Sequence, residues 1–435
     1  TVPERGPMNI NLLPDLAAMA TLLSILHFLR RRHLQEGVGL WIVGLLFIFL
    51  EAIAHAFYTP SGPLHIPMHV LALDSYLAAG IIFLWAASKP LFARLPTLIY
   101  LGANTLALAA IETIYAFDVR DPKPYYIAAA LGLVIGLATP FFLARTFQLG
   151  NVGRLIVVQL FFWLPIWFFA SERMFRDAAY FPLFLLYLST AAVFAMSLPR
   201  NSLGRIAIVA GFLVWAFVFL AHSWVTNRPQ YIDVAAEVWN WQKFLVTIGM
   251  LLVLLERQVS SNEWVALHDQ LTGLPNRRLF EDKMEEAIQQ AQRTGSRVAI
   301  VMIDLNGFKA VNDTRGHDTG DRLLQYIAQN LRRSIRSTDT LARLGGDEFI
   351  LLASNLPGNL PTSRIVEIAT TRVIETLKQP FEVDDESFVV GGSVGVAIYP
   401  DDTTDEILLR RLADQRMYEQ KRQVSSTVPE GASAT

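Results

Sequence analysis

Cysteine is absent from the 435-residue chain, which excludes disulfides, thiolate zinc sites and iron–sulfur clusters. Charge is scarce as well, because only 17% of the residues are charged whereas 52% are hydrophobic. Soluble proteins carry about 25% charged residues. Part of this chain is therefore expected to lie in lipid.

The scarcity of charge is confined to the first half of the chain. Residues 1–255 carry few charges, and most of the charged side chains follow from Glu256 onward. The composition therefore predicts a membrane domain at residues 1–255, a short helical linker at 256–267 and a soluble domain after it.

Apolar runs of about 18 residues or more are long enough to cross a hydrocarbon core as helices. The runs lie near residues 10–29, 38–58, 66–87, 95–116, 124–145, 154–170, 177–197, 205–225 and 232–255. They predict an α-helical polytopic membrane domain of about nine spans.

Positive charge alternates between the connecting loops. One set of loops carries Arg30, Arg31, Arg32, Lys89, Arg94, Arg145, Arg154, Arg200 and Arg205. The opposite set carries Arg120, Lys123, Arg173, Arg176 and Arg228, so the bias is moderate. Since basic loops stay in the cytoplasm, nine spans place the N-terminus outside and the soluble domain inside.

Ionisable residues within the predicted spans are costly in lipid and usually face a bundle interior. They are Asp15, His27, Glu51, His55, Asp74, Glu112, His222, Glu237 and Lys243. Glu51 and His55 share a helix face, as do His65 and His69. Two interpretations remain open, namely hydrogen bonds between helices and a pocket for a metal, a haem or an unidentified small ligand.

The soluble half begins with a strand that ends in a carboxylate. Residues 298–304 read Val-Ala-Ile-Val-Met-Ile-Asp, a continuous apolar run typical of a buried strand. The strand is expected to deliver Asp304 to its edge. Helical periodicity follows over residues 323–331.

A hairpin is predicted around the sequence Gly345-Gly346-Asp347-Glu348, which lies between two apolar runs. If it pairs beside the strand that ends at Asp304, three carboxylates converge without a neutralising base nearby. Oxygen ligands of this kind favour Mg²⁺ or Mn²⁺. Taken alone, however, the hairpin is equally compatible with a plain acidic turn.

Four ordered motifs in this half resemble the GGDEF family, at residues 269–278, 304–313, 316–321 and 345–349. The resemblance implies an α/β palm-like GGDEF domain at residues 268–422, followed by a disordered tail at 423–435. The implied activity is that of a diguanylate cyclase, which condenses two GTP into cyclic di-guanylate (c-di-GMP) and two pyrophosphates. The membrane domain would then be a transmembrane sensor of a signal that the sequence does not name.

The resemblance also implies the metal site of the reaction. Its ligands would be Asp304, the Leu305 carbonyl, Asp347 and Glu348, with two Mg²⁺ (or Mn²⁺) in each active site. Asp347 is in addition the implied base for the ribose 3′-hydroxyl. Two such ions activate an attacking hydroxyl and stabilise a leaving phosphate oxygen.

Substrate-binding residues are implied in the same way. Asn312 and Asp321 resemble the guanine readers, and an amide with a carboxylate matches the donors and acceptors of guanine. His317 would shape the substrate loop or pack within it. Lys309 and Lys421 would compensate phosphate charge.

The sequence departs from the family pattern at Ser425, where an arginine is usual. Triphosphate affinity is expected to be lower there, or Arg422 to substitute.

Arg336 and Asp339 match the family's product-binding inhibitory motif. An arginine can grip a phosphate or guanine with two hydrogen bonds while the aspartate orients it. The alternative is a solvated ion pair at a helix end.

The end of the last span and the linker together offer a dimer seam, because Leu252, Leu255, Val259, Asn262 and Ala266 alternate three and four apart. Its alternative is an amphipathic extension that packs on its own domain. The expected partners are GTP, c-di-GMP, membrane lipid and a second copy of the chain, with no nucleic acid polymer.

The expected location is the bacterial inner (cytoplasmic) membrane. Two other functions remain open: a catalytically silent membrane effector that binds c-di-GMP at Arg336 and Asp339, and a transporter with a regulatory nucleotide domain.

Overall fold

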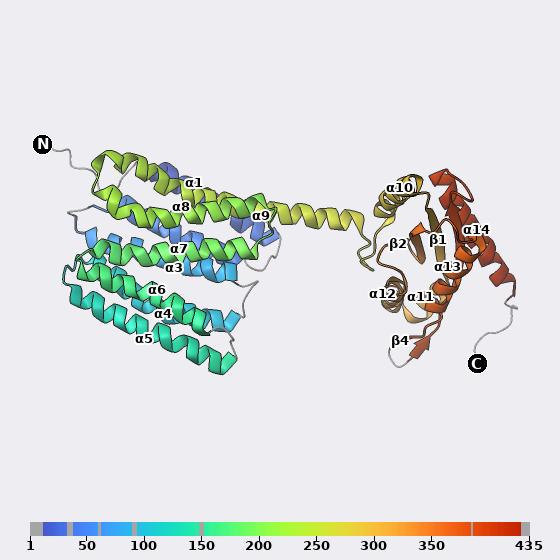
Figure 1. The fold of residues 1–435 in the computed structure, drawn as a ribbon, viewed down its shortest axis with the longest axis horizontal. Coiled ribbons are helices and arrows are strands. Elements are labelled where there is room, and N and C mark those ends of the chain that lie inside the picture. Colours follow the sequence, from blue (N-terminus) through green and yellow to red (C-terminus); the bar gives the residue numbers. More distant parts are fainter. Residues whose placement is uncertain are drawn as a thin grey trace. The chain divides into compact units, whose positions relative to one another are not determined.

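The computed structural model describes residues 12–32, 38–59, 62–88, 94–147, 152–383 and 386–427 (Figure 1). The chain divides into two compact units, residues 1–258 and 259–435. Most of the predicted tail (428–435), the start of the first predicted span, Lys89 and the side chains of Glu237 and Ser425 lie outside the described residues.

The first unit is helical. Its helices are α1 (Leu13–Arg32), α2 (Val38–Phe57), α3 (His65–Ser88), α4 (Arg94–Ala116), α5 (Pro122–Phe147), α6 (Val152–Ser171), α7 (Phe175–Ser197), α8 (Leu203–Thr226) and α9 (Ile232–Leu267). Within the described ranges, nine helices are long and apolar enough to cross a membrane, as the sequence predicts. Helix α9 runs without a break to Leu267, so residues 256–267 belong to the same helix as the last predicted span.

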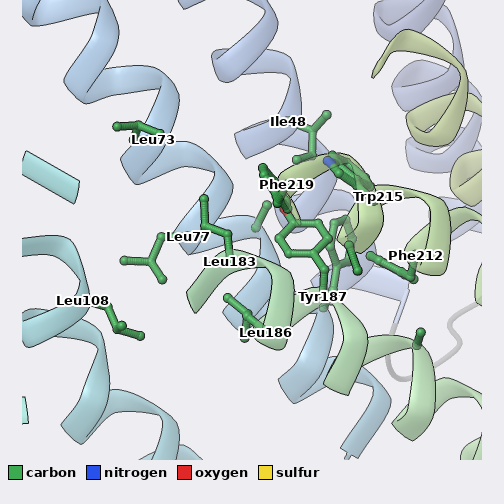
Figure 2. Close-up of a cluster of buried hydrophobic side chains, with 14 of the residues drawn as sticks. Ile48, Leu73, Leu77, Leu108, Leu183, Leu186, Tyr187, Phe212, Trp215 and Phe219 are labelled. Atoms are coloured by element: carbon green, nitrogen blue, oxygen red, sulfur yellow. The ribbon is translucent and has the colours of Figure 1, made fainter. Parts of the chain in front are cut away.

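Large apolar side chains fill the centre of the helical unit, and Figure 2 shows part of this cluster. Its labelled members are Ile48, Leu73, Leu77, Leu108, Leu183, Leu186, Tyr187, Phe212, Trp215 and Phe219. Apolar side chains also cover the outside, where Leu106 is 80% and Trp241 75% exposed. A surface of this composition suits lipid rather than water.

The second unit is an α/β domain. Its elements are α10 (Arg277–Thr294), β1 (Arg297–Asn306), α11 (Phe308–Arg315), α12 (His317–Ser334), β2 (Thr340–Gly345), β3 (Glu348–Leu356), α13 (Thr362–Leu377), β4 (Phe381–Val383), β5 (Glu386–Phe388), β6 (Gly391–Tyr399) and α14 (Glu406–Thr427). Helix α14 thus continues through Thr427, whereas the sequence predicts a disordered tail from Gln423.

The main sheet has the strand order β2-β3-β1-β6, and each pair is antiparallel. Helices α12 and α13 pack on one face, against Val301 and Ile303 of β1. Helices α10 and α14 pack on the other face, against Ile300 and Met302. Strand β1 is therefore buried on both sides, which explains its unbroken apolar sequence. This βαββαβ arrangement agrees with the expected palm-like fold.

Candidate active site

The hairpin and the end of β1 form the centre of the site. Strand β3 pairs with β1 so that Glu348 lies directly across from Asp304. The Leu305 N–H donates to the Asp347 carbonyl at 3.3 Å, which ties the turn to β1. Gly345 and Gly346 both have positive φ, 143° and 53°, a conformation that favours glycine. The predicted hairpin beside Asp304 is thus confirmed.

A lysine neutralises Asp304, which corrects one expectation. The sequence predicts no neutralising base near the three carboxylates, but Lys421 Nζ lies 2.6 Å from Asp304 Oδ1. Helix α14 brings the lysine there by packing on β6, where the Gln420 side chain accepts a hydrogen bond from the Val394 N–H. The hydrogen bond to Asp304 raises the pKa of Lys421, so this side chain stays cationic.

Negative charge nevertheless remains in excess around Glu348. Burial raises the pKa of this carboxyl, and the charges of Asp304, Asp414 and Asp347 raise it further, in that order. The charge of Arg277 lowers it only in part. Asp414 was not among the predicted site residues, although it lies within a stretch that resembles the family. A cation bound beside Glu348 would relieve this repulsion.

The donor set fits a divalent ion, because carboxylate oxygens are the ligands that Mg²⁺ and Mn²⁺ prefer. In the described part of the chain, however, no group of three or more acidic or histidine side chains is gathered closely enough to hold a metal ion. The carboxylates of Asp304 and Glu348 are neighbours in the sheet, and the Lys421 ammonium supplies the positive charge beside Asp304.

The predicted guanine readers lie on α11 and α12. Asn312 Oδ1 is buried and has no hydrogen-bond partner among the residues that the structure describes. A Cβ atom on Gly320 would lie 1.8 Å from this oxygen, so the amide occupies space that only glycine leaves open. Sequence reasoning missed Gly320, because a glycine in a helix gives no sign of what it faces. Asp321 follows it and is exposed.

The remaining predicted substrate residues are exposed. Lys309 lies on α11, and His317 is the first residue of α12, one turn before Asp321. Positions four apart on a helix share a face, so His317 and Asp321 border the same surface. Arg422 is exposed on α14.

Arg343 supports the hairpin and was also missed. Its Nη1 lies 2.9 and 3.1 Å from the two carboxylate oxygens of Asp269. Its Nε and Nη2 donate to the Gly346 carbonyl at 3.0 and 2.7 Å. Burial acts to raise the pKa of Asp269, but hydrogen bonds from Thr272 and Arg343 outweigh it and lower this pKa. These contacts link the motif at residues 269–278 to the turn that carries Asp347.

The Arg336 and Asp339 motif closes a turn. Asp339 is 6% exposed, and its Oδ2 accepts a hydrogen bond from the Arg336 backbone N–H at 3.2 Å. The aspartate thus holds the backbone of Arg336, and the arginine side chain is exposed. Within the described ranges, the Oδ1 atom of Asp339 is buried without a hydrogen-bond partner, and this residue lines a pocket of about 480 Å³ together with Arg332.

Glu51 and His65 contact residues outside their own helices, whereas Oδ1 of Asp74 and both carboxylate oxygens of Glu112 are buried without a hydrogen-bond partner among the described residues. Glu51 is 5% exposed, accepts a hydrogen bond from Tyr76 at 2.7 Å and lies 2.7 Å from His55 Nδ1. His65 Nε2 lies 3.1 Å from Asp118 Oδ2. These contacts favour the packing interpretation for Glu51 and His65.

Residues 266–427 match the family model described as "Diguanylate cyclase, GGDEF domain". This part of the chain is a GGDEF domain. The family covers the α/β unit and the end of α9 but not the helical unit.

The curated relatives are named for different activities. The "Bifunctional diguanylate cyclase/cyclic di-GMP phosphodiesterase MucR" of Pseudomonas aeruginosa is 43% identical over 37% of this chain and 22% of its own length. The "Cyclic di-GMP phosphodiesterase NbdA" of the same organism is 26% identical over 84% of this chain and 45% of its own length. The chain thus spans less than half the length of these curated relatives.

Among solved structures, a sensory box/GGDEF family protein from Caulobacter crescentus is 35% identical. The match covers 36% of this chain and 99% of that chain, with a TM-score of 0.34.

Proposed function

We propose that this chain is a membrane-bound diguanylate cyclase that condenses two GTP into c-di-GMP and two pyrophosphates, under the control of a signal sensed by the helical unit. The observation that carries the proposal is the placement of Asp347 and Glu348 on a glycine turn directly beside Asp304 in a GGDEF domain.

In the proposed reaction, each ribose 3′-oxygen attacks the α-phosphate of the other GTP. Asp347 accepts the proton of the attacking hydroxyl, and Lys309 and Lys421 balance the charge of the phosphates. Asp304, the Leu305 carbonyl, Asp347 and Glu348 would hold Mg²⁺ or Mn²⁺, which when bound lowers the pKa of the attacking hydroxyl and stabilises the leaving oxygen.

Guanine would be recognised on α11 and α12. The unpartnered Oδ1 of Asn312 can accept from guanine, and the Asp321 carboxylate can accept from its N–H groups. His317 would border this site. Adenine would leave these polar groups unpaired, which penalises the wrong base.

Because each cyclase domain binds one GTP, the reaction requires two copies face to face. We propose that a homodimer supplies them. Its proposed partners are GTP, c-di-GMP and membrane lipid, and they include no nucleic acid polymer. Its proposed location is the bacterial inner membrane, with the N-terminus outside and the GGDEF domain in the cytoplasm. The apolar exterior of the helical unit and the alternation of basic loops support this placement.

The test is direct synthesis. The full chain, purified in detergent with GTP and Mg²⁺, is expected to release c-di-GMP and two equivalents of pyrophosphate, detected by mass spectrometry and a pyrophosphatase-coupled assay. Chelation of the metal is expected to stop both. A protein that binds GTP but yields no c-di-GMP with either Mg²⁺ or Mn²⁺ would overturn the proposal.

A second candidate is a silent effector that binds c-di-GMP without making it. The buried, unpartnered Oδ1 of Asp339 beside a pocket of about 480 Å³ favours product binding at this place. The presence of Asp304, Asp347 and Glu348 argues for synthesis instead. Binding of c-di-GMP without turnover of GTP would select the effector.

Gly320→Ala is expected to raise the KM for GTP about tenfold or more, because the added methyl group displaces the Asn312 amide. The change in kcat should be smaller, since the metal-binding hairpin is untouched. Steady-state kinetics check this, with Ala328→Gly on the same helix as a control for helix stability. An unchanged KM would mean that Asn312 does not read the base.

Arg336→Ala is expected to relieve inhibition by added c-di-GMP at least fivefold without abolishing synthesis. The backbone N–H that Asp339 holds survives this substitution, so the turn should remain. Initial rates measured against added product provide the test, with the exposed Arg333→Ala as the matched control. Unchanged inhibition would mean that Arg336 is a solvated side chain that does not bind the product.

A further inference from the structure

A pocket of about 520 Å³ opens in the helical unit where the α4–α5 loop, the α6–α7 turn and the end of α8 meet. Three arginines line it, namely Arg120, Arg173 and Arg176, against one carboxylate, Asp177. The distribution of basic residues over the loops predicts that these arginines lie on the outer side of the membrane. Membrane topology does not require an excess of positive charge on that side. Their convergence therefore requires another explanation.

Arg173 occupies a backbone conformation that disfavours it. Its φ is 58°, in the left-handed region, and its N–H donates to the Ala170 carbonyl at 3.1 Å to close the last turn of α6. Glycine or asparagine is the usual residue at such a position. Within the described residues, the guanidinium of Arg173 has no hydrogen bond or ion pair, so the local fold gives no reason for an arginine here.

The other two arginines are held in place by a buried tyrosine. Tyr115 is 5% exposed, and its hydroxyl accepts a hydrogen bond from Arg176 Nε at 3.2 Å. The guanidinium of Arg120 lies 5.6 Å from the centre of the same ring, and its Nη2 lies 2.6 Å from Asp118 Oδ1. Among the contacts of the described residues, Arg176 thus uses only Nε for support, which leaves its Nη groups for a ligand.

A buried donor faces the same pocket. Ser223 on α8 lines it, and the Oγ atom of this serine is buried without a hydrogen-bond partner in the described part of the chain. Trp224 of α8 and Asn227, the residue after the end of this helix, continue the wall. Fixed guanidinium groups with a nearby hydroxyl are the groups that recognise planar or tetrahedral oxyanions.

We propose that this pocket binds a small anion that carries a carboxylate or a phosphate group. The anion pairs with Arg173 and Arg176 and accepts a hydrogen bond from Ser223. A soluble anion and the headgroup of an anionic lipid share this chemistry, and the experiment below separates them.

Helix α8 connects the pocket to α9. The far end of α8 is fixed by Glu256 of α9, whose Oε1 accepts from the N–H groups of Leu203 at 2.8 Å and Gly204 at 3.2 Å. The backbones of α8 and α9 also pack closely at Gly249, where an added Cβ atom would lie 2.7 Å from the Ile208 nitrogen. A shift of α8 on anion binding would therefore move α9, the helix that runs into the GGDEF domain. This coupling, unlike the pocket itself, rests on the proposed function.

The decisive variant is Arg173→Gly, which removes the guanidinium while giving the left-handed position the residue that suits it. Its thermal stability without ligand should equal or exceed that of the wild type. Arg154→Gln serves as the control for net charge, because Arg154 is an exposed residue of α6 that does not line the pocket.

Binding is measured on the full chain by thermal shift and equilibrium dialysis with inorganic phosphate and with succinate, at constant ionic strength. We expect saturable binding in the wild type and in Arg154→Gln, weakened about tenfold or more in Arg173→Gly. A second arm uses nanodiscs of phosphatidylcholine with and without phosphatidylglycerol. Saturable, Arg173-dependent stabilisation only by phosphatidylglycerol assigns the site to a lipid headgroup.

Absence of binding in both arms, or equal binding by all three proteins, would overturn the anion site. Rates of c-di-GMP synthesis, measured with and without the same probe, test the coupling separately. Binding that leaves the rate unchanged would overturn the coupling through α8 alone. Binding by a chain that makes no c-di-GMP would contradict the proposed function and leave the pocket assignment standing.

Discussion

Replacement of Asp347 by alanine is expected to lower the rate of c-di-GMP synthesis by roughly a hundredfold or more, because it removes both a metal ligand and the candidate base. The turn itself should survive. Its link to β1 runs through the Asp347 carbonyl, and its link to Arg343 runs through the Gly346 carbonyl, so neither uses the deleted carboxylate.

The measurement compares kcat for GTP at saturating Mg²⁺ between the wild type and Asp347→Ala, with circular dichroism to confirm the fold. Asp282→Ala is the matched control, since Asp282 is an exposed acidic residue on α10. Synthesis at the wild-type rate by the Asp347 variant would remove the hairpin from the mechanism.

Local patterns predicted the hairpin and β1 because their causes lie in adjacent residues. An unbroken apolar run requires burial on both faces, and paired glycines allow the positive φ of a tight turn. The same reasoning predicted the nine long apolar helices, because the thickness and polarity of a hydrocarbon core set the length and composition of a helix that crosses it.

Long-range contacts escaped the sequence analysis. The ion pair between Lys421 and Asp304 joins residues 117 positions apart, so no local pattern records it. The Gly320 contact with Asn312 depends on how α12 crosses α11. The Arg343 contact with Asp269 depends on how the turn at residues 269–275 lies against β2, where the Arg343 N–H donates to the Pro275 carbonyl. Helical propensity likewise gave no sign that α14 continues to Thr427.

Insertions in α9 are expected to change the activity according to helix phase. The helix is continuous to Leu267, and Leu255 and Val259 on it are 59% and 47% exposed, as a seam awaiting a second copy would be. A four-residue insertion after Gln258 turns the following helix by roughly 40° relative to its original face. A seven-residue insertion turns it by only about 20°, in the opposite sense. We expect the first to change the rate of synthesis at least tenfold and the second by less than threefold.

The test measures synthesis and oligomeric state together for both insertions, by product assay and by light scattering in detergent. A matched pair of variants, Leu255→Ser and the exposed Gln289→Ser on α10, separates loss of the seam from a general effect on stability. Equal effects of the two insertions would indicate a flexible tether in place of a phased helix. A monomer that synthesises c-di-GMP at the full rate would refute the dimer itself, because one bound GTP has no second 3′-oxygen to attack it.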